Sequence, residues 1–148
     1  MKIFLLGLIA TVFLGNFSAS AQKSELSRAK TEVINAQMVV LVEYAKASGA
    51  TRMSYPDWVK STGDFNPTKN QTILLKKAYD YAIKKAPACE IMKADNSILY
   101  TVAKEGFTNF PNQAMAKEGC NFFCKLKNLL NALIAVVEAV EELFTTIP

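Results

Sequence analysis

The sequence contains no histidine among its 148 residues. Histidine is the usual general acid or base of enzymes and a common metal ligand, so its absence excludes Ser-His-Asp and Cys-His nucleophile systems and HExxH metal sites. Glycine and proline are also scarce, with six and five residues, and no repeat or low-complexity tract divides the chain. We therefore expect no metal site, no cofactor and no catalytic residues in a single domain over residues 22–148.

The excess of positive charge is small. Seventeen basic residues stand against 13 acidic ones, giving a net charge of +4, and they are spread along the chain. A nucleic-acid-binding protein needs a concentrated basic patch. We therefore expect no nucleic acid among the partners.

The first segment has the pattern of an export signal. Lys2 supplies a positive start, the run Ile3–Gly15 is apolar and uncharged, and Ala19-x-Ala21 places small side chains where a signal peptidase needs them. The run is shorter than the roughly 20 apolar residues of a spanning helix. The pattern predicts a signal peptide over residues 1–21, cleavage before Gln22, and a secreted or periplasmic product.

Apolar residues of the remaining chain recur at steps of three and four, which is the helical period. No segment has a convincing strand pattern, so we predict an all-α fold, a small bundle of about four to five helices with a long apolar C-terminal helix. The expected helices before the last one run over about 24–48, from Ser54 to Gly63, from an Asn66 cap to Pro87, and from Asp95 or Asn96 to Gly106.

The last helix carries the clearest pattern. Its apolar stripe steps 4-3-4-3-4-3 through Phe122, Leu126, Leu129, Leu133, Val136, Val140 and Leu143. Such a wide face is typical of a core helix, and the alternatives are a partner-binding or a membrane-active helix. Lysines near its start and glutamates near its end oppose the helix dipole, so this helix should depend on packing.

Three cysteines, Cys89, Cys120 and Cys124, are expected in an oxidising compartment. On a regular helix Cys120 and Cys124 would lie about 6 Å apart, too far for the ~3.8 Å between Cβ atoms of a disulfide. We therefore expect Cys89 to bridge to Cys120 or Cys124. The remaining thiol is then buried and inert, reactive near a helix N-terminus, or the link in a dimer, which the C-terminal helix could also form.

Aromatic residues of the connections are the candidate binding residues. Tyr55 and Trp58 lie near Pro56, and Phe107 and Phe110 precede Pro111. Such rings either form a stacking surface for a sugar or peptide or close the ends of the core.

The composition thus predicts a small exported helical protein that acts by binding or structural association, not catalysis. Its partner is a protein, a glycan or a membrane surface. One alternative is a membrane-active or antibacterial protein that uses its C-terminal amphipathic helix. A further alternative is a carboxylate-based enzyme, which would need Asp57 and Asp64, or another such pair, to meet in a cleft.

Overall fold

Helices dominate the computed structural model, which describes residues 19–111 and 120–145. The expected all-α fold with a long C-terminal helix is confirmed, with six α-helices in the described residues where about four to five were expected. The predicted signal run Ile3–Gly15 lies outside these residues. The elements are α2 (Ala19–Ala47), the 3-10 turn η1 (Ala50–Arg52), α3 (Tyr55–Thr62), α4 (Lys69–Ile83), α5 (Ala88–Lys93), α6 (Ser97–Glu105) and α7 (Phe122–Thr145).

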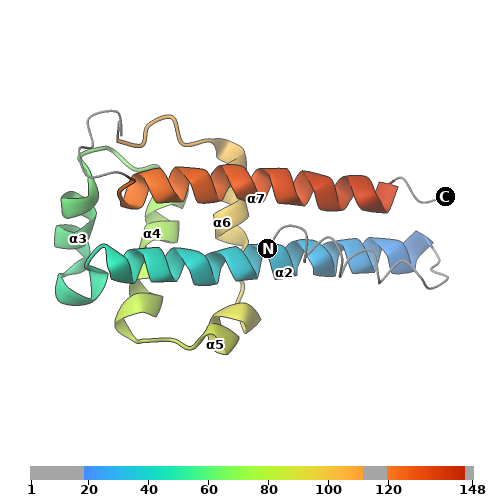
Figure 1. Ribbon diagram of the computed structural model, residues 1–148, viewed down its shortest axis with the longest axis horizontal. Helices are drawn as coiled ribbons and strands as arrows, with labels where there is room; N and C mark the ends of the chain where they lie inside the picture. Colours follow the sequence, from blue (N-terminus) through green and yellow to red (C-terminus); the bar gives the residue numbers. More distant parts are fainter. Residues whose placement is uncertain (1–18, 112–119, 146–148) are drawn as a thin grey trace.

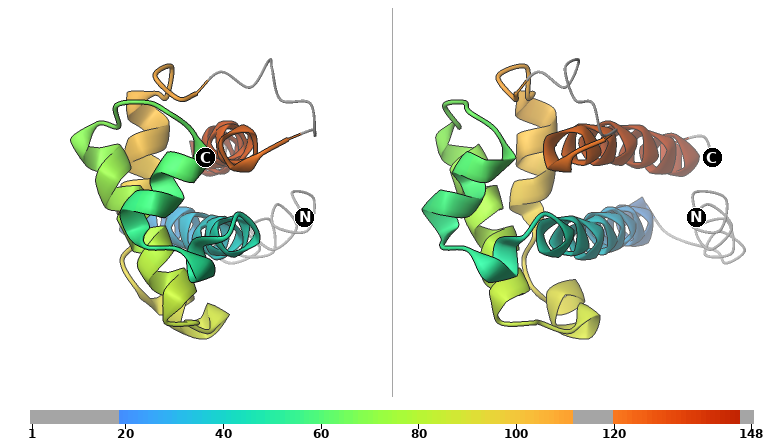
Figure 2. Two further views of the ribbon diagram at one scale, coloured as in Figure 1. Left: turned by 90° about the vertical axis from the view of Figure 1, so that its left-hand side faces the viewer. Right: turned by 60° about the vertical axis from the view of Figure 1, so that its left-hand side comes forward.

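The two longest helices, α2 and α7, lie side by side and antiparallel (Figure 1). Two contacts mark their register: Lys30 pairs with Glu141 at 3.1 Å, and the Lys125 ammonium lies 5.6 Å from the centre of the Tyr44 ring. Helices α4 and α6 cross the same side of this pair, α3 closes one end, and α5 packs beside α2 (Figure 2). The bundle is therefore built around one helix pair.

The apolar stripe of α7 is part of the core. Leu126, Leu133 and Val140 are each 0% exposed, and the neighbouring row of Phe123, Leu130 and Val137 is equally buried. These side chains meet the buried face of α2, which includes the following residues: Val33, Met38, Leu41, Val42 and Ala45. Within the described residues, no helix is both long and apolar enough to cross a membrane.

Helix α5 is the element that the sequence pattern did not predict. Pro87 ends α4 and directly precedes the six residues of α5. Asn35 of α2 donates to the Met92 carbonyl at 2.7 Å, and Asn96 donates to the Asn35 Oδ1 at 2.9 Å and to the Ile91 carbonyl at 2.8 Å. This buried network holds α5 against α2, since buried amides stabilise a fold only when they are paired.

Helix α4 begins later than its predicted Asn66 cap. Thr68 is the N-cap: its hydroxyl accepts from the Gln71 backbone N–H at 3.2 Å, and the Gln71 side chain accepts from the Thr68 N–H at 3.0 Å. This reciprocal capping box satisfies two otherwise unpaired N–H groups. The Asn66 carbonyl instead accepts from the Asn109 side chain.

Truncating Leu133 tests whether the α7 stripe is core. Leu133→Ala should lower the free energy of unfolding by about 2–5 kcal/mol because it leaves a cavity, and Leu133→Glu should unfold the protein because it buries an unpaired charge. Thermal melts of the two purified variants measure these losses of stability. The exposed Asn131→Ala, on the same helix, is the control and should stay within about 0.5 kcal/mol. Unchanged melting of both Leu133 variants would contradict the buried stripe.

Candidate functional site

The four aromatic candidates belong to one chain of touching rings. Trp58 and Phe110 are buried, whereas Tyr55 and Phe107 are half-buried. The chain runs from Tyr55 to Trp58 (centroids 6.3 Å apart), Trp58 to Phe122 (5.2 Å), Phe122 to Phe123 (5.3 Å), Phe123 to Phe110 (5.1 Å) and Phe110 to Phe107 (5.6 Å). The rings therefore join α3, the segment after α6 and the start of α7, with only the two end rings partly open to solvent.

Trp58 offers no ring face to a ligand. It is 0% exposed, and its Nε1–H donates to the Ser48 Oγ at 2.8 Å. A buried indole normally finds such a partner for its one N–H. This hydrogen bond holds α3 against the C-terminal end of α2.

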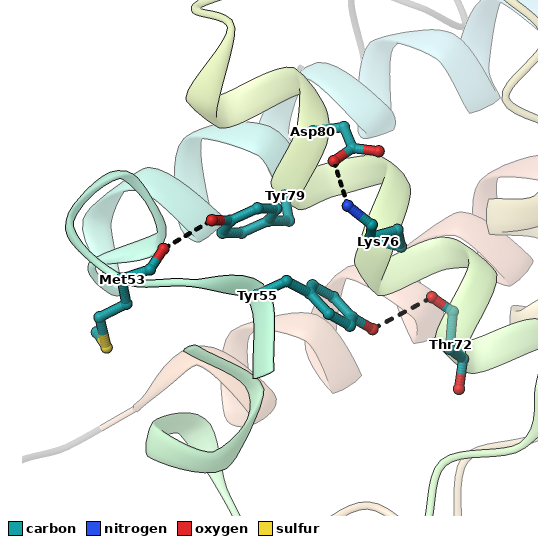
Figure 3. Close-up of polar contacts among 6 residues, drawn as sticks. All are labelled: Met53, Tyr55, Thr72, Lys76, Tyr79 and Asp80. Atoms are coloured by element: carbon teal, nitrogen blue, oxygen red, sulfur yellow. Dashed lines mark hydrogen bonds and ion pairs between the residues drawn. The ribbon is translucent and has the colours of Figure 1, made fainter. Parts of the chain in front are cut away.

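The half-buried Tyr55 lies in a cluster on α4 that Figure 3 shows. Its hydroxyl lies 3.4 Å from the Thr72 carbonyl, and the Tyr79 hydroxyl donates to the Met53 carbonyl at 2.7 Å. Lys76 lies 5.4 Å from the centre of each of these two rings. These contacts hold the segment from η1 to α3 against α4.

Charge in this cluster is balanced. Lys76 pairs with Asp80 at 2.8 Å, and this hydrogen bond raises the pKa of the lysine. Partial burial raises the pKa of the Tyr55 hydroxyl, against the opposing effect of the Lys76 ammonium. At neutral pH the phenol is therefore neutral and the lysine charged. The contacts of this cluster hold the start of α3 against α4.

A hollow of about 240 Å³ lies where α2 and α3 end and α7 begins; we call it the Lys125 hollow. Apolar wall is supplied by Ala47, Phe122 and the Tyr44 ring. The polar lining consists of Ser48, Ser61, Thr62, Asn121 and Lys125.

The polar groups of the Lys125 hollow are held in place by local hydrogen bonds. Ser61 and Thr62 each donate to a carbonyl three residues earlier in α3, both at 2.7 Å. The Asn121 Oδ1 accepts from the Cys124 backbone N–H at 3.1 Å, which leaves its amide NH₂ for other contacts. Lys125 is half-buried, and no carboxylate among the described residues pairs with it. Among the described residues, the lining of the hollow therefore has one positive charge and no negative charge.

A second hollow, of about 480 Å³, lies between the start of α4 and the end of α6. Asn70 donates to both oxygens of Glu105 at 2.8 and 2.9 Å. Gln71 and Asn109 exchange two amide hydrogen bonds at 2.8 and 2.7 Å. These groups already satisfy one another, so they brace α6 and the following loop against α4.

The structure corrects the predicted disulfide. Cys120 bonds to Cys124, with Cα atoms 5.1 Å apart, and the predicted bridge from Cys89 is wrong. The prediction placed Cys120 and Cys124 on one regular helix, but α7 begins only at Phe122, so Cys120 lies before the helix and is free of helical spacing. A loop this short adds about 2 kcal/mol of stability on the chain-entropy model, less than the longer loop would.

Cys89 is the free cysteine of the described residues and is exposed at the start of α5. The expectation of a buried, inert thiol is therefore wrong for this cysteine. A dimer through its thiol stays a prediction. Asp57 and Asp64 are both exposed, and neither lines either hollow.

The sequence pattern missed both hollows, because each is assembled from segments far apart in the chain. The nearest signal was the pair of Lys125 and Lys127 at the unfavourable end of the last helix. The chain matches no protein-family model, no curated protein and no solved structure.

The raised pKa values of Tyr55 and Tyr81 predict the response to alkali. Burial raises both above 10.0, so the folded state keeps these phenols protonated where the unfolded chain has begun to ionise them. The stability that they contribute is present below pH 10 and is lost as the pH rises through the folded-state pKa values. Subtracting the ultraviolet titration curve of Tyr55→Phe or Tyr81→Phe from that of the unmodified protein gives the phenolate signal of the replaced tyrosine. This signal should appear above pH 10. Its appearance below pH 10 would contradict the burial described for these residues.

Proposed function

We propose that this chain is a small exported helical protein that acts by binding or structural association and not by catalysis. The observation that carries the proposal is the contrast between its core and its hollows. The apolar stripe of α7 is used within the bundle, whereas both surface hollows include polar side chains in their linings. Recognition of a partner then depends on polar groups at the ends of the bundle.

The arrangement of acidic residues supports binding over a carboxylate-based reaction. The Lys125 hollow has no carboxylate in its lining, and the second hollow has only Glu105, whose two oxygens both accept from Asn70. Hydrolysis by carboxylates needs two such groups facing one substrate.

The burial of α7 also weighs against the membrane-active alternative. A helix that enters a membrane must present its apolar face, and here Leu126, Leu133 and Val140 face the core. Exposing them would require the bundle to open. The exposed glutamates Glu138 and Glu142 would also be repelled by an anionic bilayer.

Dye release from lipid vesicles tests this choice. The protein starting at Gln22 should release no dye from vesicles of phosphatidylglycerol and phosphatidylcholine, or of phosphatidylcholine alone, because its apolar residues stay buried. Glu138→Lys, which removes a repulsive charge from an exposed position, is the matched variant and should be equally inactive. Dye release by the unmodified protein that rises with anionic lipid and rises further with Glu138→Lys would overturn the proposal in favour of the membrane-active reading.

A further inference from the structure

We propose that the Lys125 hollow binds a small organic carboxylate. This inference deepens the proposed function, on which it rests, by naming the ligand class at one site. Lys125 is half-buried, it is the one charged residue in the lining of the hollow, and no carboxylate among the described residues pairs with it. A ligand anion would supply the partner that the described residues do not.

The Lys125 side chain is already restricted by a neighbouring ring. Lys125 lies over the Tyr44 ring of the neighbouring helix, 5.6 Å from its centre, which restricts the long side chain before any ligand arrives. Restricting a binding group in advance lowers the entropy lost on association. Asn121 and Tyr44 also line the hollow and carry neutral donors, and the Asn121 NH₂ donates to no residue that the structure describes.

The remaining lining suggests what accompanies the carboxylate. The hydroxyl hydrogens of Ser61 and Thr62 point to α3 carbonyls, so their oxygens remain as acceptors for an N–H or O–H of the ligand. Ala47 and Phe122 offer apolar wall for a short side chain. At about 240 Å³ the hollow is smaller than the roughly 300–1,000 Å³ of drug-sized pockets, so the ligand group is small.

An N-acylated amino acid has this chemistry: a carboxylate, one N–H and a short side chain. The same group ends every peptide chain. The free acid and the C-terminal residue of a peptide are therefore two sources of one ligand group. A peptide can bind only if the hollow leaves room for the residues that precede its C-terminus, whereas the free acid has no such requirement.

The protein carries its own reporter for binding. Trp58 is the single tryptophan of the sequence, and its indole N–H donates to Ser48, whose side chain lies in the lining. A ligand in the hollow should alter the environment of this hydrogen bond and hence the tryptophan fluorescence. The experiment titrates the protein with propionate, N-acetylalanine, N-acetylalaninamide and a hexapeptide ending in alanine.

We expect N-acetylalanine to give a saturable change, propionate a weaker one, and the uncharged amide none. Lys125→Gln should weaken N-acetylalanine binding about tenfold or more, because a charge-assisted hydrogen bond is lost. Lys127→Gln is the matched control: it lies two residues away, its ammonium contacts the Pro111 carbonyl at 3.5 Å, and it is not part of the lining. Both variants should melt at the unmodified temperature, which excludes unfolding as the cause.

The hexapeptide separates the two sources. Binding at least as tight as that of N-acetylalanine assigns the site to peptide C-termini, and much weaker binding assigns it to free acids. Equal affinity for the amide, or equal loss with Lys125→Gln and Lys127→Gln, would overturn the carboxylate assignment. The assignment would also be overturned if none of the ligands gave a saturable change, either in tryptophan fluorescence or in NMR chemical shifts. Since none of these outcomes bears on dye release, the proposed function is tested separately.

Discussion

Apolar packing between α2 and α7 is the interaction on which the rest of the structure depends. The charges of α7 oppose its own dipole, so this helix gains its stability from the partner helix and not from its local sequence. Leu133 on α7 and Met38 on α2 are both 0% exposed. The shorter helices are then added to this pair: α4 and α5 pack on α2, and α6 packs on α7 and α4.

Under the proposed function, this use of apolar surface limits where a partner can be recognised. The widest apolar face is buried in the bundle, and of the large apolar side chains described only Ile73 and Ile83 are strongly exposed. Polar groups concentrate instead where helices end, because helix ends leave backbone groups and short side chains that are not paired within the helix. The Lys125 hollow lies at such a junction of three helix ends, and it combines an unbalanced positive charge with hydrogen-bonding groups already held in place.

The long helices could be predicted from the sequence because each buries a continuous apolar stripe, whose residues recur every three to four positions. Features that depend on the local path of the chain could not be predicted in this way. The start of α7 at Phe122 leaves Cys120 outside the helix and permits a bond to Cys124 that regular spacing forbids. Helix α5 is held to α2 by the bonds of Asn35 to the Met92 carbonyl and of Asn96 to Asn35, which join residues 57 and 61 positions apart and have no periodic signature. Both hollows depend on contacts of this kind, so no local pattern could locate them.

Native-state hydrogen exchange tests most directly the claim that α2 and α7 form one core. If they do, amides near Met38 and near Leu133 should be the slowest to exchange. Their free energies of opening should be equal to each other and to the global free energy of unfolding, since both helices open only when the whole bundle does. Exchange near Leu133 that is orders of magnitude faster than exchange near Met38 would contradict the account, because α7 would then be detaching from a bundle that stays folded without it.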